Sequence, residues 1–503
     1  MLTNYPEWVS DAVFYLIFPD RFAKSPRLPK PTNLENWDSP PTLFGFKGGD
    51  LYGILEKIDY IQDLGVNTLL LNPIFTSAAN HRYHTIDYFS VDPILGGTQA
   101  LRELVDTLHS RGMRIVLDGV FNHTGRGFYQ FNHTLENGAA SPYVDWFHFN
   151  QAWLKEGRQI DAYPKNFIPL EAGDGSLCLE NFGYKGWWNL PALPKLNTDN
   201  KDVRKFLLDV AKYWIDFGID GWRLDVPSEI NDPSFWQEFR NVVKNANPEA
   251  YIVGEIWEDA TPWLHGDQFD AVMNYPFTKS LVSFIPQKSF MEAEVAATGG
   301  YKGVKPFKAP EFGAALNKLL GSYSKEVNLV QLNLIGSHDT PRFLNCAGGD
   351  HKALMLAALF MCAFPGVPCV YYGDEIGLSG SADPDCRKSF PWEEYKWNRE
   401  VLNSFKDSIM LRKKESAIRH GSFIELLADG EIYAFARKYN NEVVIFVFNT
   451  DSNPKNLASL TIPINGLTQI RELSSDHTIA LKEGALNEVS LPPRSAKVFK
   501  AIK

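Results

Sequence analysis

The chain has 503 residues, of which 44% are hydrophobic and 22% charged, so it can bury a sizeable core and is not an intrinsically disordered protein. Its length suits two or three domains better than one compact unit. The formal net charge of −10 argues against nucleic acid or an anionic membrane as a partner.

The cysteines and the N-terminal residues indicate the cellular compartment in which the protein works. The five cysteines are irregularly spaced and form no CxxC pair, which predicts free thiols in a reducing compartment. The opening MLTNYPEWVSD lacks the basic and apolar regions of a signal peptide, so we expect a cytoplasmic protein. The longest uncharged run, 353–373, is divided by Pro365, Gly366 and Pro368 into a helix, a turn and a short strand, so we predict no membrane span.

Compact apolar runs alternate with helical patterns along most of the chain. Buried strands are predicted at 11–18, 66–71, 114–117, 219–225, 251–254, 269–273, 330–335 and 367–371. Helices are predicted at 50–64, where Asp50 is the cap, at 97–111 and at 201–217. Continuous apolar strands separated by helices indicate a parallel sheet covered on both faces, and eight such units make a (β/α)8 TIM barrel.

The alternation is interrupted once and then ends. Residues 125–195 are loop-rich and aromatic, which predicts an inserted domain after the third strand. From 416 onward, period-two segments such as EVVIFVFN with Asn and Gly turns predict a C-terminal antiparallel β-sandwich domain, 416–503. The predicted fold class is therefore α/β, with the catalytic barrel formed by 1–124 and 196–415.

The stretch GIDGWRLDVPSE, 218–229, contains charges where a buried strand would end. In a strand, Arg223 and Asp225 share one face, and two buried charges are costly unless they satisfy each other. An isolated pair of this kind is more often a structural ion pair. The alternative is a carboxylate that an arginine keeps ionised, as a nucleophile requires.

Similar residues follow the other predicted strands. The polar side chains at these strand ends are Tyr83, His84, Asp87, Asp118, Asn122, His123, Arg223, Asp225, Glu229, Glu255, His338, Asp339 and Arg342. In a TIM barrel all strand ends of one polarity meet at the face that carries the active site. Helix capping explains one aspartate but not carboxylates after four strands. Metal binding is the competing explanation, but no HxH or HExxH spacing occurs, so we predict no metal ligands here.

Four of these segments, DGVFNH, GWRLDVPSE, GEIW and GSHD, resemble the signature segments of the α-amylase family of glycoside hydrolases. LPKLN at 193–197 resembles a further segment typical of the neopullulanase, cyclomaltodextrinase and maltogenic amylase branch. The resemblance covers nearly the whole chain. It implies a retaining hydrolase of α-1,4-glucosidic bonds, with some α-1,6 cleavage, in starch-derived glucans.

The resemblance also implies roles for individual residues. The nucleophile would be Asp225, the general acid/base Glu255 and the transition-state stabiliser Asp339. The positions that match substrate-binding residues are Tyr83, His123, Arg223, Glu229, Trp257, His338, Arg342, Asp383 and Arg387.

Retention requires two carboxyl groups about 5–5.5 Å apart, one ionised and one protonated. From sequence neighbours alone, we expect Arg223 to lower the pKa of Asp225. We expect the apolar neighbours of Glu255 to raise its pKa.

Some positions depart from the branch. His84 stands where an Asp is common, and Leu16 where a Gln is usual. Relatives often bind calcium through a loop after the first strand and a Gly-Gly-Asp segment. Here Asp50 remains, but the loop AKSPRLPKP has almost no oxygen ligands, so we expect no required cofactor and no calcium at that place. Asn122 could belong to a second calcium site reached through the insertion.

Two expectations concern access to the site. Members of the branch carry an extra N-terminal β domain that narrows the site in a dimer, and only about ten residues precede the first predicted strand here. We therefore expect a more open cleft and a monomer. Trp187 and Trp188, shortly before LPKLN, either pack the core of the insertion or form a stacking platform for a glucose ring.

Two other functions remain as alternatives. One is a glucan transglycosylase or phosphorylase on the same scaffold, since fold does not fix the acceptor. The other is a non-catalytic glucan-binding relative, against which the presence of Asp225, Glu255 and Asp339 argues. The preferred substrate stays open among cyclodextrin, pullulan, maltooligosaccharide and starch, as does the ratio of hydrolysis to transfer.

Overall fold

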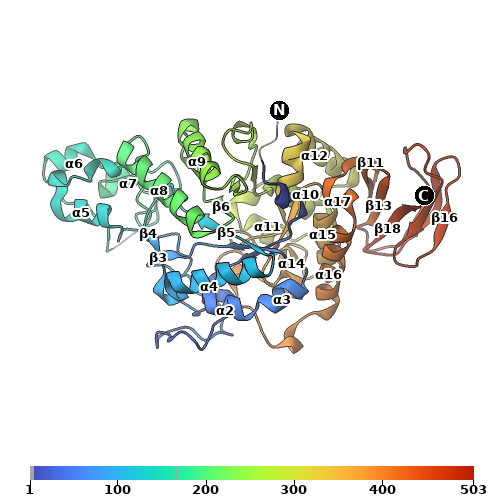
Figure 1. The fold of residues 1–503 in the computed structure, drawn as a ribbon, viewed down its shortest axis with the longest axis horizontal. Coiled ribbons are helices and arrows are strands. Elements are labelled where there is room, and N and C mark those ends of the chain that lie inside the picture. Colours follow the sequence, from blue (N-terminus) through green and yellow to red (C-terminus); the bar gives the residue numbers. More distant parts are fainter. Residues whose placement is uncertain (1–4, 166–167, 503) are drawn as a thin grey trace.

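The computed structural model describes residues 5–165 and 168–502. Eight parallel strands lie at the centre of an elongated molecule, with helices α5–α7 at one end and the C-terminal sheet at the other (Figure 1). These strands are β1 (Phe14–Ile17), β2 (Thr68–Leu71), β5 (Arg114–Gly119), β6 (Gly221–Leu224), β7 (Tyr251–Gly254), β8 (Ala271–Val272), β9 (Leu332–Leu334) and β10 (Val367–Tyr371). Their order is β8-β7-β6-β5-β2-β1-β10-β9, and a parallel bridge between Met273 and Leu332 closes the sheet. The predicted TIM barrel is confirmed.

Helices surround the barrel or lie in the segments that follow its strands. They are α1 (Pro19–Phe22), α2 (Leu51–Glu56), α3 (Ile58–Asp63), α4 (Gly97–Ser110), α8 (Lys201–Phe217), α9 (Pro233–Ala246), α10 (Tyr275–Phe284), α11 (Glu292–Ala296), α12 (Ala309–Ser322), α13 (Lys325–Val330), α14 (Phe343–Cys346), α15 (His351–Ala363), α16 (Arg399–Lys414) and α17 (Ser416–His420). Asp50 caps α2 as predicted, by accepting from the N–H of Gly53. The single helix predicted over 50–64 is wrong, because the backbone leaves helical geometry at Lys57 and α3 starts anew.

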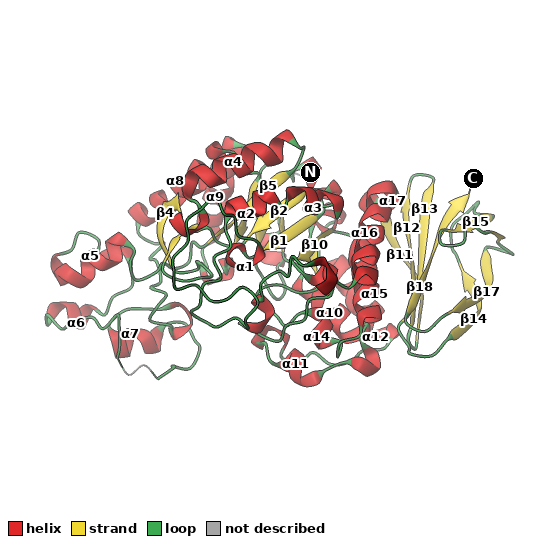
Figure 2. Ribbon diagram, turned by 90° about the horizontal axis from the view of Figure 1, so that it is seen from below, coloured by secondary structure: helices red, strands yellow, loops and turns green. Residues whose placement is uncertain are grey.

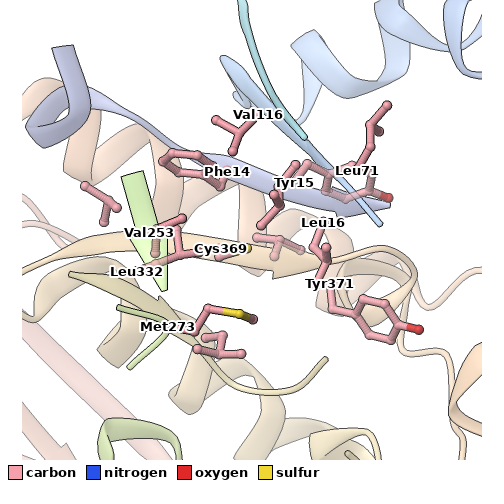
Figure 3. Close-up of a cluster of buried hydrophobic side chains, with 14 of the residues drawn as sticks. Phe14, Tyr15, Leu16, Leu71, Val116, Val253, Met273, Leu332, Cys369 and Tyr371 are labelled. Atoms are coloured by element: carbon pink, nitrogen blue, oxygen red, sulfur yellow. The ribbon is translucent and has the colours of Figure 1, made fainter. Parts of the chain in front are cut away.

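The barrel interior changes from apolar to charged toward the carboxyl ends of the strands. Phe14, Val116, Val253, Leu332 and Cys369, from five different strands, lie in one buried cluster (Figure 3). At the carboxyl end of β5, the strand register pairs Asp118 with Arg223 of β6, and Arg223 with Val253 of β7. Side-chain alternation then turns Asp118 and Arg223 into the same end of the barrel.

Between β5 and α8 the chain leaves the barrel. This region contains α5 (Tyr129–Asn137), α6 (Gln151–Lys155) and α7 (Ser176–Phe182), which extend outward beyond α8 and the hairpin of β3 (Phe75–Ser77) and β4 (Thr85–Val91) (Figures 1 and 2). Stacked and edge-on rings of Phe131, Phe147, Phe149 and Tyr184 form its core. The exact limits of the inserted domain stay a prediction.

The C-terminal part is antiparallel. Its strands are β11 (Ser422–Asp429), β12 (Ile432–Tyr439), β13 (Glu442–Asn449), β14 (Lys455–Thr461), β15 (Gln469–Glu472), β16 (Thr478–Ala480), β17 (Ala485–Leu491) and β18 (Ser495–Ile502). Six form a sheet in the order β11-β12-β13-β18-β15-β16, and the β14–β17 pair shares a separate apolar core with it.

Two buried arginines meet at the end of α15: Arg412 comes from α16, and Arg437 of β12 joins the C-terminal sheet to the barrel. Arg412 and Arg437 donate to the carbonyls of Cys362 and Ala363, the last residues of α15, where a helix favours positive charge.

Two further expectations can be compared with the fold. All five cysteines are buried and unpaired, as predicted. Among the helices of the described residues, none has both the length and the apolar character that crossing a bilayer demands.

Candidate active site

One guanidinium joins carboxylates from three adjacent strands. Arg223 Nη1 lies 2.8 Å from both oxygens of Asp118 and 3.1 Å from Asp225 Oδ1. Arg223 Nη2 lies 2.9 Å from Glu255 Oε2 as an ion pair without hydrogen-bond alignment. All four side chains are buried, so the carboxylates of Asp225 and Glu255 meet at one cation away from bulk water.

Glu255 is fixed from two further directions. Trp257 Nε1 donates to its Oε1 and the Val226 N–H to its Oε2, both at 3.1 Å. The Trp257 ring is itself held by stacking on Tyr275, with 3.7 Å between centroids and 6° between planes. Val226 has φ 36°, an unfavourable value for a β-branched residue, and this turn aims its N–H at Glu255.

Asp339 lies on a more open side of the site. His338 Nε2 is 3.1 Å from its Oδ2, and Arg387 Nη2 is 3.3 Å from its Oδ1. Arg387 Nη1 also pairs with Asp383 at 3.0 Å. The side chain of Asp339 is 30% exposed, against 8% for Asp225 and 5% for Glu255.

Tyr83 connects the two sides. Its hydroxyl donates to Asp118 at 2.9 Å and lies 2.6 Å from His338 Nε2, while its ring is nearly parallel to that of His338. Asn72 Nδ2 donates to the Tyr83 hydroxyl and contacts His338 Nδ1 at 3.0 Å. This assigns the His338 proton to Nε2, which faces Tyr83 and Asp339.

His123 is completely buried beside this group. Asn122 Nδ2 lies 3.1 Å from its Nδ1, which assigns the ring proton to Nε2, and Nε2 has no aligned acceptor among the described residues. Burial, together with the proximity of His84 and Lys195, lowers the pKa of His123 to about 3, so the ring is neutral. Trp187 stacks on it, with 5.2 Å between centroids.

The carboxyl groups compete for one guanidinium. Burial raises the pKa of Asp118 to about 6 and the pKa of Glu255 above its usual range, and Arg223 opposes both shifts. The expected lowering for Asp225 is wrong: burial and the neighbouring carboxylates raise its pKa well above the usual value, and Arg223 offsets only part of this. Burial also raises the pKa of Asp339, against Arg387.

Two predicted site residues lie outside the cluster. Arg342 is completely buried and donates to Asp374 and to the Tyr372 and Cys386 carbonyls, so it positions the loop that carries Arg387 and does not face the cleft. Glu229 is partly exposed and pairs with Lys195 at 3.6 Å.

Sequence reasoning placed Asp118 at a strand end without giving it a role, and it did not assign Asn72 to the site. The alternation that puts Asp118 and Arg223 on one face was the available signal for Asp118. No local signal marked Asn72.

The place where relatives hold calcium does not suit a cation here. Asp50 Oδ2 accepts from Lys30 Nζ at 2.6 Å and from the Ser25 N–H at 2.9 Å, and its Oδ1 accepts from the Gly53 N–H. Donors therefore occupy both oxygens, and an ammonium already supplies the positive charge. Within the described part of the chain, no group of three or more His, Cys, Asp or Glu could hold a metal ion.

The site thus combines three buried carboxyl groups at one guanidinium with a fourth, more open carboxylate. Such a set can supply a nucleophile, a proton donor and negative charge for a cationic transition state.

Comparison with known proteins places this chain in a family. The α-amylase catalytic domain family matches residues 16–420. A cyclomaltodextrinase of Thermoanaerobacter pseudethanolicus is 43% identical over 89% of this chain and 71% of its own length. The crystal structure of a protein from Thermus thermophilus has a TM-score of 0.89 at 43% identity, covering 98% of this chain and all of that one. The native debranching enzyme of Nostoc punctiforme has a TM-score of 0.87 at 42% identity, covering 99% of this chain and all of that one. The chain belongs to the α-amylase family and is a glycoside hydrolase.

Proposed function

We propose that this protein is a retaining hydrolase that cleaves α-1,4-glucosidic bonds, and some α-1,6 bonds, in maltooligosaccharides, cyclodextrins, pullulan and starch. The observation that carries the proposal is the contact of Asp225 and Glu255 with the same Arg223 guanidinium. The names of relatives support the substrate class. They include a cyclomaltodextrinase, the neopullulanase 2 of Thermoactinomyces vulgaris at 39% identity, and the debranching enzyme of Nostoc punctiforme.

The reaction has two steps. Asp225 attacks the anomeric carbon while Glu255 protonates the departing glycosidic oxygen, which leaves a glucosyl ester on Asp225. Glu255, now ionised, takes a proton from water, and the resulting nucleophile breaks the ester and restores both carboxyl groups. Arg223 holds the two groups in place, and Asp339 stabilises the positive charge that develops on the ring.

Other residues would hold the sugar at the point of cleavage. The parallel rings of Tyr83 and His338 provide a flat wall, and the Nε2 of His123, which has no aligned partner among the described residues, can donate to a hydroxyl. The Arg387–Asp383 pair stands next to Asp339 and would bind a glucose unit further from the cut.

Product analysis tests the proposal. The purified protein is incubated separately with β-cyclodextrin, pullulan, maltohexaose and soluble starch, and products are separated by chromatography. We expect short maltooligosaccharides from at least one of these substrates and α-anomers as the first products by NMR. Absence of new reducing ends with all four would overturn the function.

We also propose where the protein acts in the cell and how it assembles. The relative named intracellular maltogenic amylase of Bacillus subtilis, 41% identical over 88% of this chain, supports a cytoplasmic location. The expected monomer stays a prediction, which light scattering of the purified protein tests.

A further inference from the structure

We propose that Trp188 forms a stacking subsite for a glucose unit on the leaving-group side of the cleavage point, where the departing chain and a sugar acceptor bind. This deepens the proposed function and depends on it.

Three rings form a parallel row that leads outward from the site. Trp187 stacks on the buried His123 with 12° between planes, and Trp188 stacks on Trp187 at the same distance of 5.2 Å and the same angle. Trp188 is 51% exposed. The row therefore begins at a residue of the active site and ends on an indole available to a ligand. Glucose rings bind on such flat apolar faces.

Neither Trp187 nor Trp188 belongs to the core of the insertion. That core consists of Phe131, Phe147, Phe149 and their neighbours, packed on Tyr184. Of the two alternatives for these tryptophans, the packing therefore favours the platform.

The backbone holds Trp188 outward at a cost. Trp188 and Asn189 have φ 54° and φ 58°, in the left-handed region that favours glycine. The Asn189 side chain keeps this turn in place. It is buried, accepts from the Cys178 N–H at 3.1 Å and donates to the Glu171 carbonyl at 2.7 Å. A tryptophan held in the left-handed region by a neighbouring buried amide, next to an active site, points to function rather than to packing.

The connections of the segment place Trp188 on one side of the barrel mouth. Bridges join Gly186 to Pro194 and His123 to Lys195, and Lys195 Nζ donates to the Glu229 carbonyl after β6. The Asp383–Arg387 pair follows β10, which is four strands from β6 in the closed barrel of eight and thus opposite to it.

The position of the proposed proton donor, Glu255, identifies the β6 side as the leaving-group side. Glu255 follows β7, next to β6, whereas Asp339 contacts Arg387 on the opposite side. Because the general acid must face the departing oxygen, the β6 side receives the leaving group. Trp188 therefore lies where the first or second glucose unit beyond the cut would bind.

Unsatisfied polar atoms lie along the same row. Trp187 Nε1 and His123 Nε2 are buried and have no aligned hydrogen-bond partner among the described residues. Both are donors, and buried donors without partners are rare in native proteins. Hydroxyl groups of a bound sugar would satisfy them.

The test compares substrates with and without a sugar on the leaving-group side. Maltohexaose occupies that side, whereas α-maltosyl fluoride leaves it empty. For Trp188→Ala we expect kcat/KM on maltohexaose to fall about three- to tenfold, mainly through KM, because one stacking contact is lost. For the same variant, kcat/KM on α-maltosyl fluoride should stay within about twofold of the wild-type value. Trp188→Phe keeps a ring and should retain most of the activity on maltohexaose.

Tyr395→Ala is the matched control, because Tyr395 is 84% exposed and its ring lies beside the Lys396 ammonium, 5.9 Å from its centroid. This variant should leave kcat/KM unchanged on both maltohexaose and α-maltosyl fluoride. Equal losses of Trp188→Ala on both substrates, or unchanged kinetics on maltohexaose, would overturn the subsite. A wild-type protein inert to both substrates would instead refute the proposed function.

A second readout follows transfer. With glucose added as acceptor, the fraction of transfer products made from α-maltosyl fluoride should fall in Trp188→Ala, because the acceptor loses its platform. An unchanged fraction would contradict the acceptor role.

Discussion

Two groups of buried carboxylates at the mouth of this barrel differ in their hydrogen bonding. Asp20, in α1, and Asp50, the cap of α2, are saturated. Asp20 accepts from Arg21 Nε and from the N–H groups of Lys47 and Gly48, and Asp50 accepts from Lys30 and two N–H groups. Asp225 is equally deep but accepts one hydrogen bond within the described residues, from Arg223.

This difference separates a structural from a chemical use of the same side chain. Donors on every oxygen stabilise a carboxylate and remove its nucleophilic lone pairs, which suits a loop that must be rigid. Crowded carboxyl groups with few donors stay reactive, at a cost in folding free energy. The predictions below test this contrast, beginning with the largest expected effect.

Replacing Asp225 by Asn should abolish hydrolysis, with a loss of about 10⁴-fold or more in kcat, because no covalent intermediate can form. The same change should leave the melting temperature equal or higher at pH 7. Burial raises the pKa of Asp225 above its value in the unfolded chain. At any pH above that unfolded-chain pKa, the ionised carboxylate therefore lowers the free energy of unfolding, and Asn removes that penalty. Activity assays and calorimetry measure both. An active Asn variant that has not deamidated would contradict the assignment.

Glu255→Gln should show a substrate-dependent loss. On maltohexaose the first step should slow about 10²- to 10⁴-fold, because the leaving oxygen lacks its proton donor. α-Maltosyl fluoride needs little protonation and should lose far less in that step, which a burst experiment resolves. A loss of the same size on both would mean that Glu255 is not the acid.

Lys30→Met tests the saturated group. Without the ammonium, Asp50 becomes a buried carboxylate with two backbone donors, so we expect about 1–3 kcal/mol of destabilisation and nearly unchanged kcat. Lys24→Met is the control, because Lys24 in the same loop is exposed and its ammonium lies over the ring of Trp37, away from Asp50.

The same experiment addresses calcium. We propose that the wild-type protein needs none, since Lys30 supplies the charge at Asp50. EDTA should leave its melting temperature and activity unchanged. A fall on chelation that calcium reverses would refute this.

The smallest expected effect is on the pH profile. Asp225 must be ionised to attack, and burial raises its pKa, so the acid limb of kcat/KM should lie well above the ordinary aspartate value of about 3.9. Asp118 contributes to that rise, so Asp118→Asn should move the limb to lower pH. The midpoint belongs to the coupled carboxyl groups together. An acid limb below pH 4, or an acid limb that does not shift in Asp118→Asn, would contradict the claim that burial and neighbouring carboxyl groups raise the pKa of Asp225.

The sequence was sufficient for the barrel because each strand is a continuous apolar run and each strand end carries its own signal. Strand alternation placed Arg223 and Asp225 on one face, and the structure agrees. The predicted direction of the pKa shift of Asp225 was wrong, because the sequence around Asp225 shows neither its burial nor the carboxylates of Asp118, Glu255 and Asp339, which approach from other strands.

The same limit explains the other differences. Arg342 looked like a cleft residue from its position after Asp339, but its partner Asp374 lies 32 residues away. Likewise Trp187 became part of the site only through its stacking on His123, a contact between segments 64 residues apart. Local patterns therefore identify which residues face the barrel mouth, and long-range contacts decide what each of them does.

The most direct test of the account is to trap the covalent intermediate. A 5-fluoroglycosyl fluoride forms a glycosyl ester that hydrolyses slowly, so the labelled protein can be digested and analysed by mass spectrometry. We predict one 5-fluoroglycosyl group on the peptide that contains Asp225, at the carboxylate itself. A label on Glu255 or Asp339, or β-anomers as the first products of maltohexaose cleavage, would contradict the account.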